Sequence, residues 1–441
     1  MENIIKTLLF DWLDRKLPQT RHRSYNLEKI TDQQINKILV LTGFRRVGKT
    51  YLLYSFANEK LKTVTKKELI YLNFEDERIP RKTEFLTQLL PSIQALFGGL
   101  PKFLLLDEIQ IIPEWSKWLR RIHETNDIRI IVTGSNSKMS SFEIPTELRG
   151  RFIEKHINPL IFSEFIEFKN FSDDLTTLDH NQPAFSRLKL LLNEYLFFGG
   201  LPEVVLADES IKNDIVQSYF HTVVSLDIAE HFTIRNDELL RQLIRLMLNQ
   251  RSFTVNKLYN TLKSNQYTSS KNTLIDYLGY IKSAYFYNYI VCFSYSIKDE
   301  LKHPRKLYCI DNAFITCLST QFSKNIGMYY ENVVARHLLN LGKEVYYWKS
   351  DQDNYEVDFV IKDDIKVTQL VQVAYQINDA DTLNREIRAL IKSSEKLNCK
   401  NLYVINEFDD RKQTFEWFGT KAEIQFLPLW KFLLFWPKNE D

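Results

Sequence analysis

The chain has 441 residues, of which 44% are hydrophobic and 26% are charged, so it is expected to fold into several globular domains. The 58 basic and 56 acidic side chains nearly cancel, and any nucleic-acid surface must therefore be a local patch rather than a property of the whole molecule. The four cysteines have no zinc-binding spacing, and the sequence contains no run of 18 apolar residues. These features predict a cytoplasmic protein without a membrane span.

The first motif, GFRRVGKT, follows a short apolar run and precedes a helical segment. It fits the phosphate-loop pattern G-x-x-x-x-G-K-[S/T], with glycines that let backbone N–H groups point at phosphate oxygens. The loop opens a helix, whose N-terminus already favours anions. Lys49 is expected to reach the β- and γ-phosphates, and the Thr50 hydroxyl to ligate Mg²⁺. The residues predicted to bind ATP are Gly43, Phe44, Arg45, Arg46, Val47, Gly48, Lys49, Thr50 and Tyr51.

The second motif, PKFLLLDEIQ, is an apolar run that ends in two acids. Ligands of open parallel sheets bind at the carboxyl ends of the strands, where Asp107 and Glu108 are expected to lie. Asp107 is predicted to hold Mg²⁺ through water, and Glu108 to orient or deprotonate the attacking water. Two acids after a strand can also cap a helix, but the phosphate loop favours the catalytic interpretation.

A third predicted strand, IRIIVTGSNS, ends in polar groups, and Thr133, Ser135 and Asn136 are candidates to touch the γ-phosphate or its water. Further along, Arg149 and Arg151 stand on either side of a glycine. Arginines in such a stretch can stabilise the charge that builds on the transferred phosphoryl group, in cis or from a neighbouring subunit of a homo-oligomer. A solvated loop with salt bridges is the alternative interpretation of both arginines.

The middle of the chain is mostly helical in its apolar spacing. SFTVNKLYNTLKS and SSKNTLIDYLGYIKSAYFYNYI predict two helices joined by a polar turn, and the basic segment FSYSIKDELKHPRK and the strand KLYCID follow. Helix, turn, helix and a β-ribbon with a basic tip is the winged-helix order. Such a module binds duplex DNA or docks a protein partner. The residues predicted to contact DNA are Ser269, Ser270, Lys271, Asn272, Lys298, Lys302, His303, Arg305 and Lys306.

Several of these segments, taken in order, resemble a family of prokaryotic ATPases that is itself similar to AAA+ proteins and the archaeal ATPase group. The segments are GFRRVGKT, FLLLDEIQIIPEW, TGSNSK, LRGRFIEKHINPLIFSEF and YLFFGGLPEVV. The resemblance covers nearly the whole chain, and many members accompany mobile elements. It implies an α/β fold with a P-loop parallel sheet, and it places Arg149 and Arg151 where AAA+ proteins carry an arginine finger. The regions it implies are a P-loop ATPase domain at 1–165, a helical region at 166–245, a winged helix at 246–311 and a nuclease-like domain at 312–441.

The last third has the order helix, three strands, helix, which resembles the core of PD-(D/E)XK nucleases. In active members two acids hold the metal, and a lysine two residues past the second acid positions the water. Asp358 matches the first acid, and Glu331 matches an acid on the preceding helix. Gln372 replaces the second acid, and Ala374 replaces the lysine. We therefore predict a nuclease-like domain that does not cut DNA.

Together the motifs predict an ATPase of the AAA+ type that uses ATP and Mg²⁺ and acts on DNA through its winged-helix and nuclease-like regions. Two alternatives stay open. One is a slow ATP-dependent switch that binds a protein partner through the winged helix. The other is an ATP-regulated nuclease in which Lys349 or Lys362 has taken over the role of the missing lysine.

Overall fold

The structure is a computed structural model, and its contacts divide the chain into two units. The first contains residues 1–158 and 283–285, and the second contains residues 159–282 and 286–441. Each unit is described by itself below. The residues that the structure describes are 1–31, 36–134, 148–234, 237–267, 269–296, 303–319, 326–350, 353, 355–375 and 380–436.

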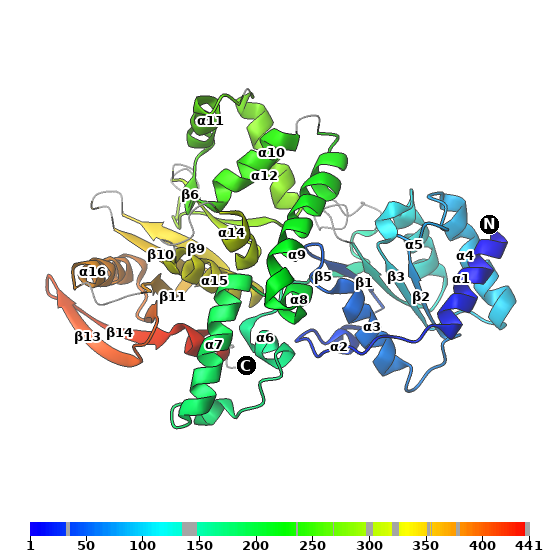
Figure 1. The fold of residues 1–441 in the computed structure, drawn as a ribbon, viewed down its shortest axis with the longest axis horizontal. Coiled ribbons are helices and arrows are strands. Elements are labelled where there is room, and N and C mark those ends of the chain that lie inside the picture. The colour runs from blue at the N-terminus through cyan, green and yellow to red at the C-terminus, as the bar shows by residue number, and fades with distance from the viewer. Residues whose placement is uncertain are drawn as a thin grey trace. The chain divides into compact units, whose positions relative to one another are not determined.

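In the described residues of the first unit, five strands form a parallel sheet with the order β2-β3-β4-β1-β5 (Figure 1). The inner strands are almost fully buried, as expected for a parallel sheet covered by helices on both faces. Strand β4 lies between β1, which leads to the phosphate loop, and β3, which ends in the two acids. The predicted α/β fold is confirmed. The strands are β1 Ile38–Thr42, β2 Leu69–Asn73, β3 Phe103–Asp107, β4 Arg129–Thr133 and β5 Phe152–His156.

Helices surround this sheet. Helix α3 starts at the end of the phosphate loop, and α1 packs against α4 and β2, where the indole Nε1 of Trp12 donates to Leu69 O at 2.7 Å. This bond satisfies the polar end of a buried aromatic ring, so that α1 can close one side of the sheet. The helices of this unit are α1 Glu2–Asp14, α2 Leu27–Thr31, α3 Lys49–Lys60, α4 Thr83–Phe97, η1 Ile109–Ile111 and α5 Trp115–Thr125.

The second unit begins with helices, as the apolar spacing predicts. Two adjacent glycines between α7 and α8 lie where the chain crosses other segments closely. A Cβ on Gly199 would lie 1.5 Å from Oδ1 of Asp311, and one on Gly200 would lie 2.3 Å from Leu160 O. Asp311 in turn accepts a hydrogen bond from Gly200 N at 2.7 Å, and burial raises the pKa of its carboxyl to about 6. The elements here are α6 Phe162–Phe168, η4 Leu175–Thr177, α7 Gln182–Phe198, α8 Pro202–Leu206, α9 Glu209–Thr222, the π-helix η5 Val223–Glu230 and α10 Asp237–Leu248.

A small antiparallel sheet of order β6-β8-β7 follows. The helix predicted over residues 269–290 is shorter than expected. Helix α12 ends at Ser283, Tyr285 takes a left-handed φ of 60°, and Tyr287–Ile290 form strand β7. The aromatic residues of this stretch favour a strand that pairs with β8 over a further helical turn. The elements are β6 Ser252–Phe253, α11 Val255–Ser264, α12 Lys271–Ser283, β7 Tyr287–Ile290, β8 Arg305–Cys309 and α14 Asn312–Leu318.

The prediction that Lys306 decorates an exposed wing is wrong. Lys306 lies in β8, its side chain is only 4% exposed, and it forms ion pairs with carboxylates of later elements. Among the other residues predicted to contact DNA, Arg305, Ser270, Lys271 and Asn272 are exposed. Lys298 and Lys302 lie outside the described residues.

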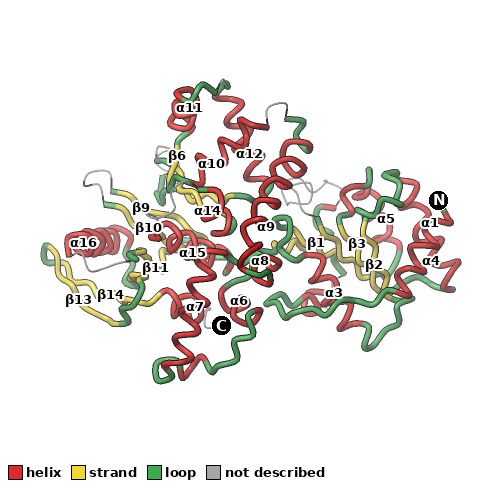
Figure 2. The backbone as a smooth tube through the Cα atoms, viewed as in Figure 1, coloured by secondary structure: helices red, strands yellow, loops and turns green. Residues whose placement is uncertain are grey.

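The C-terminal region contains a mixed sheet of order β13-β14-β12-β11-β10-β9, drawn in Figures 1 and 2, in which β9 to β11 are antiparallel and β11, β12 and β14 are parallel. The predicted order of helix, three strands and helix is present, and the later strands were not predicted. The elements are α15 Ile326–Asn340, β9 Glu344–Lys349, β10 Glu356–Asp363, β11 Lys366–Val373, α16 Ala380–Leu397, β12 Leu402–Asn406, β13 Arg411–Trp417, β14 Thr420–Pro428 and α17 Leu429–Phe435.

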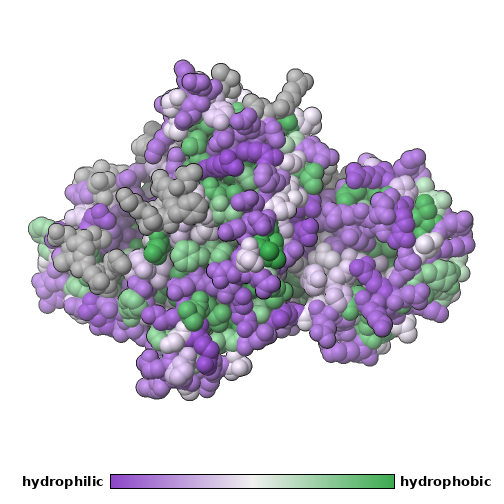
Figure 3. All heavy atoms as spheres, viewed as in Figure 1, coloured by the Kyte–Doolittle hydropathy of each residue, from purple (hydrophilic) through white to green (hydrophobic). Residues whose placement is uncertain are grey.

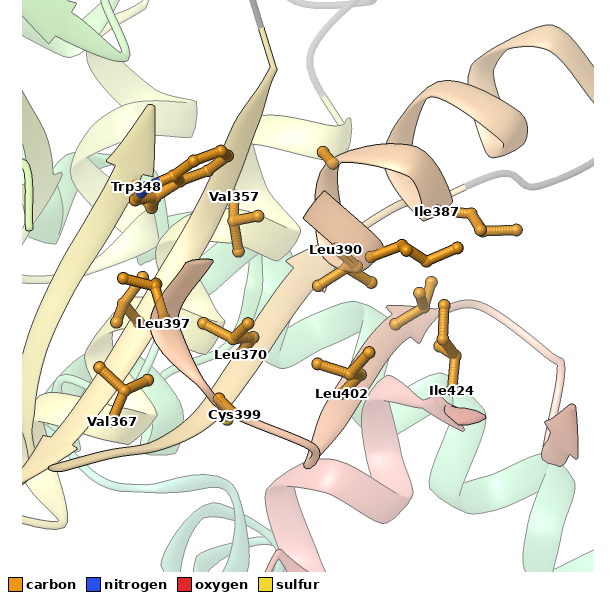
Figure 4. Close-up of a cluster of buried hydrophobic side chains, with 14 of the residues drawn as sticks. Trp348, Val357, Val367, Leu370, Ile387, Leu390, Leu397, Cys399, Leu402 and Ile424 are labelled. Atoms are coloured by element: carbon orange, nitrogen blue, oxygen red, sulfur yellow. The ribbon is translucent and has the colours of Figure 1, made fainter. Parts of the chain in front are cut away.

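The core of this region lies between α16 and one face of the sheet. Figure 4 shows Ile387 and Leu390 of α16 beside Val357, Leu370 and Leu402 of the strands, and all five are buried. Full burial of a side chain of this size contributes roughly 1.5–3 kcal/mol relative to exposure. This apolar layer therefore fixes the position of the strands that carry the predicted nuclease-like residues.

The visible face of the molecule is mostly hydrophilic, with hydrophobic residues in small groups (Figure 3). No helix in the described part of the chain has the length and apolar character needed to span a bilayer.

Candidate nucleotide-binding site

The phosphate loop is shaped by glycines at both ends. Gly43 has a φ of 142°, and a Cβ there would lie 2.2 Å from Ile157 O, so no larger residue fits. Gly48 has a φ of 97° and caps the start of α3, and Arg46 also takes a left-handed φ of 67°. Left-handed residues within a loop turn successive backbone N–H groups toward a common point, which is a shape that binds anions.

Lys49 is held over the loop that precedes it. Its side chain is buried, and its Nζ donates to Gly43 O at 2.9 Å and to Phe44 O at 3.0 Å. Charged phosphate oxygens form stronger hydrogen bonds with an ammonium than these neutral carbonyls do. The lysine is therefore already in place for a phosphate that enters the loop.

The other predicted loop residues have different surroundings. Phe44 and Val47 are fully buried, so they anchor the loop and offer only their backbone to a ligand. Arg45 forms an ion pair with Glu75 at 3.8 Å, and Tyr51 is exposed on the first turn of α3.

Asp107 is surrounded by hydroxyl groups. Its carboxylate is 1% exposed and accepts hydrogen bonds from Thr50 at 2.8 Å, from Tyr71 at 3.0 Å and from Thr133. Burial raises the pKa of Asp107, and the neighbouring charge of Glu108 raises it further. The structure thus brings the predicted metal ligands Thr50 and Asp107 together, although they are 57 residues apart in the chain.

Thr133 connects the two acids rather than facing outward. It is fully buried, its hydroxyl donates to Asp107, and it accepts a hydrogen bond from the backbone N of Glu108 at 3.1 Å. This position suits a residue that orients the two acids. The Thr133 hydroxyl makes its hydrogen bonds to these acids instead of facing the space for the γ-phosphate. Ser135 and Asn136 lie outside the described residues.

Glu108 has a constrained position. Its φ of 55° is left-handed, a conformation that costs a non-glycine residue about 1–2 kcal/mol and that often marks functional sites. Its Oε2 accepts a hydrogen bond from Gln110 Nε2 at 2.5 Å. Glu75 adds a third carboxylate, and its pKa is raised by burial and then by the charge of Glu108. Tyr71, Glu75 and Gln110 belong to no sequence motif. Their place beside the acids becomes clear only from the order of the strands and the turn after β3.

The donor set fits a magnesium ion. Mg²⁺ in phosphate-binding sites takes one or two carboxylates and hydroxyls from the protein, and phosphate oxygens and water supply its other ligands. Thr50 Oγ1 and Asp107 Oδ2 lie 2.8 Å apart at the end of the loop, next to the strand tip that carries Glu108.

The two candidate arginines lie at the N-terminal end of the strands, and the loop lies at the C-terminal end. Strand β5 runs parallel to β1 with Ile38 beside Phe152, and the Ile38 N–H donates to Arg151 O at 2.9 Å, so Arg151 marks the start of both strands. The loop lies at their far end, about 13 Å away at the usual rise per residue. Arg151 forms an ion pair with Glu124 at 2.7 Å, and Arg149 is exposed. The sheet therefore does not bring either arginine to the loop of its own chain.

Comparisons with known proteins agree with this geometry. Residues 35–166 match a family model described as an AAA domain, and residues 189–325 and 326–431 match two domains of unknown function, DUF8612 and DUF4143. The chain is 36% identical over 411 residues to the uncharacterized protein MJ1544 of Methanocaldococcus jannaschii, covering 90% of this chain and 88% of that protein. The chain belongs to the family of MJ1544.

Two further proteins are similar to this chain. An uncharacterized protein of Haemophilus influenzae is 29% identical over 363 residues, which cover 80% of this chain and 86% of that protein. Among solved structures, the Walker-type ATPase PABY2304 of Pyrococcus abyssi is similar at 15% identity and a TM-score of 0.45, covering 70% of this chain and 99% of that one. Residues 35–166, which match the AAA domain model, contain the phosphate loop and the acids that follow β3.

In the second region of unknown function, the predicted nuclease-like residues are close together but paired with other groups. Asp358 and Glu331 both contact the ammonium of Lys306. Gln372 accepts a hydrogen bond from the backbone N of Asp358 at 3.1 Å and donates to Glu386 at 2.7 Å. Sequence reasoning missed Lys306 and Glu386 in this group.

The residues predicted around the missing lysine do not restore it. Ala374 is buried in the apolar core. Lys362 forms an ion pair with Glu344 at 2.9 Å, and Lys349 lies 3.9 Å from Glu356. In the part of the chain that the structure describes, neither lysine pairs with Asp358 or Glu331.

Proposed function

We propose that this protein binds ATP together with Mg²⁺ at the loop Gly43–Thr50 and hydrolyses it with Glu108. The observation that carries the proposal is the contact of Thr50 and Asp107 at 2.8 Å, next to a glutamate held in a left-handed conformation at the strand tip. The AAA domain matched by this part of the chain supports the same conclusion.

In this mechanism the loop N–H groups and Lys49 hold the phosphates, and Thr50 and Asp107 would hold the metal. The metal, when bound, offsets the negative charge of the phosphates and of the buried acids. Glu108 orients a water in line with the γ-phosphate and accepts its proton as the water oxygen bonds to the γ-phosphorus and the bond to the leaving ADP breaks. Thr133 keeps both acids in position through its hydroxyl.

Charge on the transferred phosphoryl group is stabilised by an arginine of a neighbouring subunit, in line with the exposure of Arg149, which precedes the start of β5 and lies far from the loop of its own chain. Turnover per chain should then rise with protein concentration, and adding inactive Arg149→Ala chains should lower it. Such fingers contribute roughly 10³–10⁵-fold in rate where they act. Turnover that is independent of concentration in a proven monomer would contradict this part of the proposal.

The rest of the chain is the effector region. The order α10, β6, α11, α12, β7, β8 is the one expected of a winged helix, and the exposed Lys271 and Asn272 begin α12, the helix whose start usually makes base contacts in such modules. We infer that this module binds duplex DNA, and that a nuclease-like domain without cleavage activity follows it. The region boundaries predicted from the sequence, at 165, 245 and 311, are retained as part of this proposal. A protein partner at the same module is the alternative.

ATP turnover and ATP affinity of the wild type and of Lys49→Ala test the central proposal. Removing the ammonium aimed at the phosphates should abolish turnover and weaken binding. Lys62→Ala is the matched control, because Lys62 is exposed beyond the end of α3 and its side chain pairs with Glu59 on the surface. Equal turnover in Lys49→Ala and the wild type would rule the proposal out.

DNA binding is tested by the salt dependence of affinity in Lys271→Glu with Arg305→Glu. Lysines and arginines on phosphates release counterions, so affinity should fall log-linearly with salt, and the double variant should bind more weakly with a smaller slope. The control makes the same charge change at Lys412 and Lys421, which are exposed on the β13–β14 hairpin. If binding is equal in all three proteins, the module docks a protein instead.

A further inference from the structure

One lysine of β8 is buried among acids of the C-terminal region. The Lys306 Nζ lies 2.7 Å from Asp358 Oδ1, 2.8 Å from Glu356 Oε1 and 3.4 Å from Glu331 Oε1. Asp358 and Glu356 come from β10, and Glu331 from α15. Within the described residues, these three carboxylates converge on the ammonium of Lys306, and two of them are the acids that match the nuclease motif.

The remaining oxygens of these two acids are also engaged. Glu331 Oε1 accepts a hydrogen bond from the Tyr308 hydroxyl at 2.8 Å, and its Oε2 lies 3.4 Å from Arg251 Nη1. Asp358 Oδ2 accepts a hydrogen bond from the backbone N of Val373 at 3.0 Å. Every carboxylate oxygen that a metal would need thus faces a hydrogen-bond donor of the protein.

The charges of this cluster balance without an added ion, and the nearby Glu386 has its own partner in Arg385 at 2.7 Å. The three carboxylates face the cations of Lys306, Arg251 and Lys349. A divalent cation would have to enter beside a buried ammonium, and the repulsion between like charges is strong where water is excluded. It could bind only by displacing the ammonium of Lys306, whose side chain is buried.

The second metal-ligand position of the nuclease motif is also unsuited to a cation. Gln372 replaces the second acid, and its amide oxygen is turned onto the backbone N of Asp358 while its amide nitrogen donates to Glu386. The side chain is thus locked by two hydrogen bonds and presents no oxygen to a cation held by Asp358.

We propose that the ammonium of Lys306 occupies the place of the divalent cation in this nuclease-like site, and that it converts the site into a metal-free internal ion cluster joining β8 to α15 and β10. The proposal rests on the nuclease-like part of the proposed function and not on the ATPase part. Under this proposal no lysine takes over the catalytic role, because Lys306 neutralises the acids that a catalytic metal would need.

The test is a titration of the full chain with Mn²⁺ in the absence of nucleotide, following bound Mn²⁺ and the melting temperature. Wild type and Asp358→Asn should bind the same number of ions, because Asp358 holds an ammonium. Lys306→Met should bind about one more Mn²⁺ per chain, and its melting temperature should rise with Mn²⁺ as for any ligand that binds only the folded state. Lys306→Met with Asp358→Asn should lose that ion again.

Lys362→Met is the matched control, because Lys362 also lies on β10 but pairs with Glu344 away from the cluster, so it should gain no ion. Mn²⁺ binding by the wild type that disappears in Asp358→Asn would overturn the proposal, and this comparison decides the question even where Lys306→Met does not fold. A folded Lys306→Met that binds no additional Mn²⁺ would also overturn it. Both results leave ATP turnover, and with it the ATPase proposal, untouched.

Discussion

The molecule contains two clusters of buried acids at strands, and they differ in what surrounds the acids. Asp107 accepts hydrogen bonds from the hydroxyls of Thr50, Tyr71 and Thr133. Asp358 instead contacts the ammonium of Lys306. Hydroxyl groups orient a carboxylate but leave its charge in place, whereas an ammonium cancels it. A carboxylate motif therefore indicates a cation site only when no cation of the protein already fills it.

The protonation behaviour of the two clusters shows the same difference. Burial raises the pKa of Asp107, and repulsion from Glu108 raises it further, so the nucleotide-free site holds acids that destabilise one another. At Lys306, burial acts to lower the pKa, but the charges of Asp358 and Glu331 outweigh it and raise the pKa well above its usual value. A metal would relieve the first cluster, and the second has no such need.

The largest expected effect concerns Glu108. Glu108→Gln removes the proton acceptor but spares Thr50 and Asp107, so ATP should stay bound while turnover falls by about 10²–10⁴-fold. ATP affinity and turnover measured on the same sample check this. Glu84→Gln, an equal change at an exposed site in the first turn of α4, should leave both unchanged. Hydrolysis at the wild-type rate in Glu108→Gln would remove the water-activating role.

Asp358→Asn should lower the free energy of unfolding by on the order of 3 kcal/mol. Removing one partner of a buried ion pair leaves the other charge uncompensated, and Lys306 is only 4% exposed. Glu331 and Glu356 remain near the ammonium and keep the loss at the lower end of the usual range. Denaturant unfolding of the variant and the wild type measures the difference. An unchanged stability would mean that the cluster is not a structural ion pair.

Asp107→Asn should have the opposite sign in the nucleotide-free protein. It removes a buried charge that repels Glu108, so the free energy of unfolding should rise by about 1 kcal/mol, as is common when a functional site is neutralised. The same variant should bind ATP with Mg²⁺ more weakly, because it removes the carboxylate next to Thr50. If both Asp107→Asn and Asp358→Asn destabilise the protein equally, the contrast between the two clusters is lost.

The smallest expected effect is the pH dependence of the stability that Asp107→Asn gains over the wild type. Because the folded-state pKa of Asp107 is raised, the folded protein favours the protonated carboxyl. The stability that this form contributes is fully present below the ordinary pKa of 3.8, and it is lost as pH rises through the raised pKa. The advantage of Asp107→Asn over the wild type should therefore be absent in acid and grow as pH increases. Unfolding of both proteins across this range gives the difference directly. An advantage that is constant with pH would exclude titration of Asp107 as its cause.

The candidate nucleotide site could be proposed from the sequence because its chemistry is carried by residue types at strict spacing. The phosphate loop and the acid pair were located, and the structure brings Thr50 and Asp107 into contact. Tyr71 and Gln110 could not be predicted, since they join the site only through the order of strands and the turn after β3. The roles assigned to individual site residues stay predictions until the variants are measured.

The C-terminal cluster shows the limit of reasoning from local pattern. A lysine next to an exposed arginine in a basic stretch indicates a solvent-facing ribbon, yet Lys306 is buried. Its partners Glu331 and Asp358 are 25 and 52 residues away in the sequence, and nothing in the local spacing points to them. The strand Tyr287–Ile290 was missed for a similar reason, because its pairing with β8 decides its conformation.

The position of Lys306 also limits which segments of this chain can be exchanged between relatives during evolution. The ammonium and Arg251 precede residue 326, and the three acids they pair with follow it. An exchange of the C-terminal segment between distant relatives would leave buried charges unmatched unless lysine and acids were replaced together. The two regions of unknown function are therefore expected to be inherited as one piece, and a C-terminal segment found alone should carry either a different cation or fewer acids.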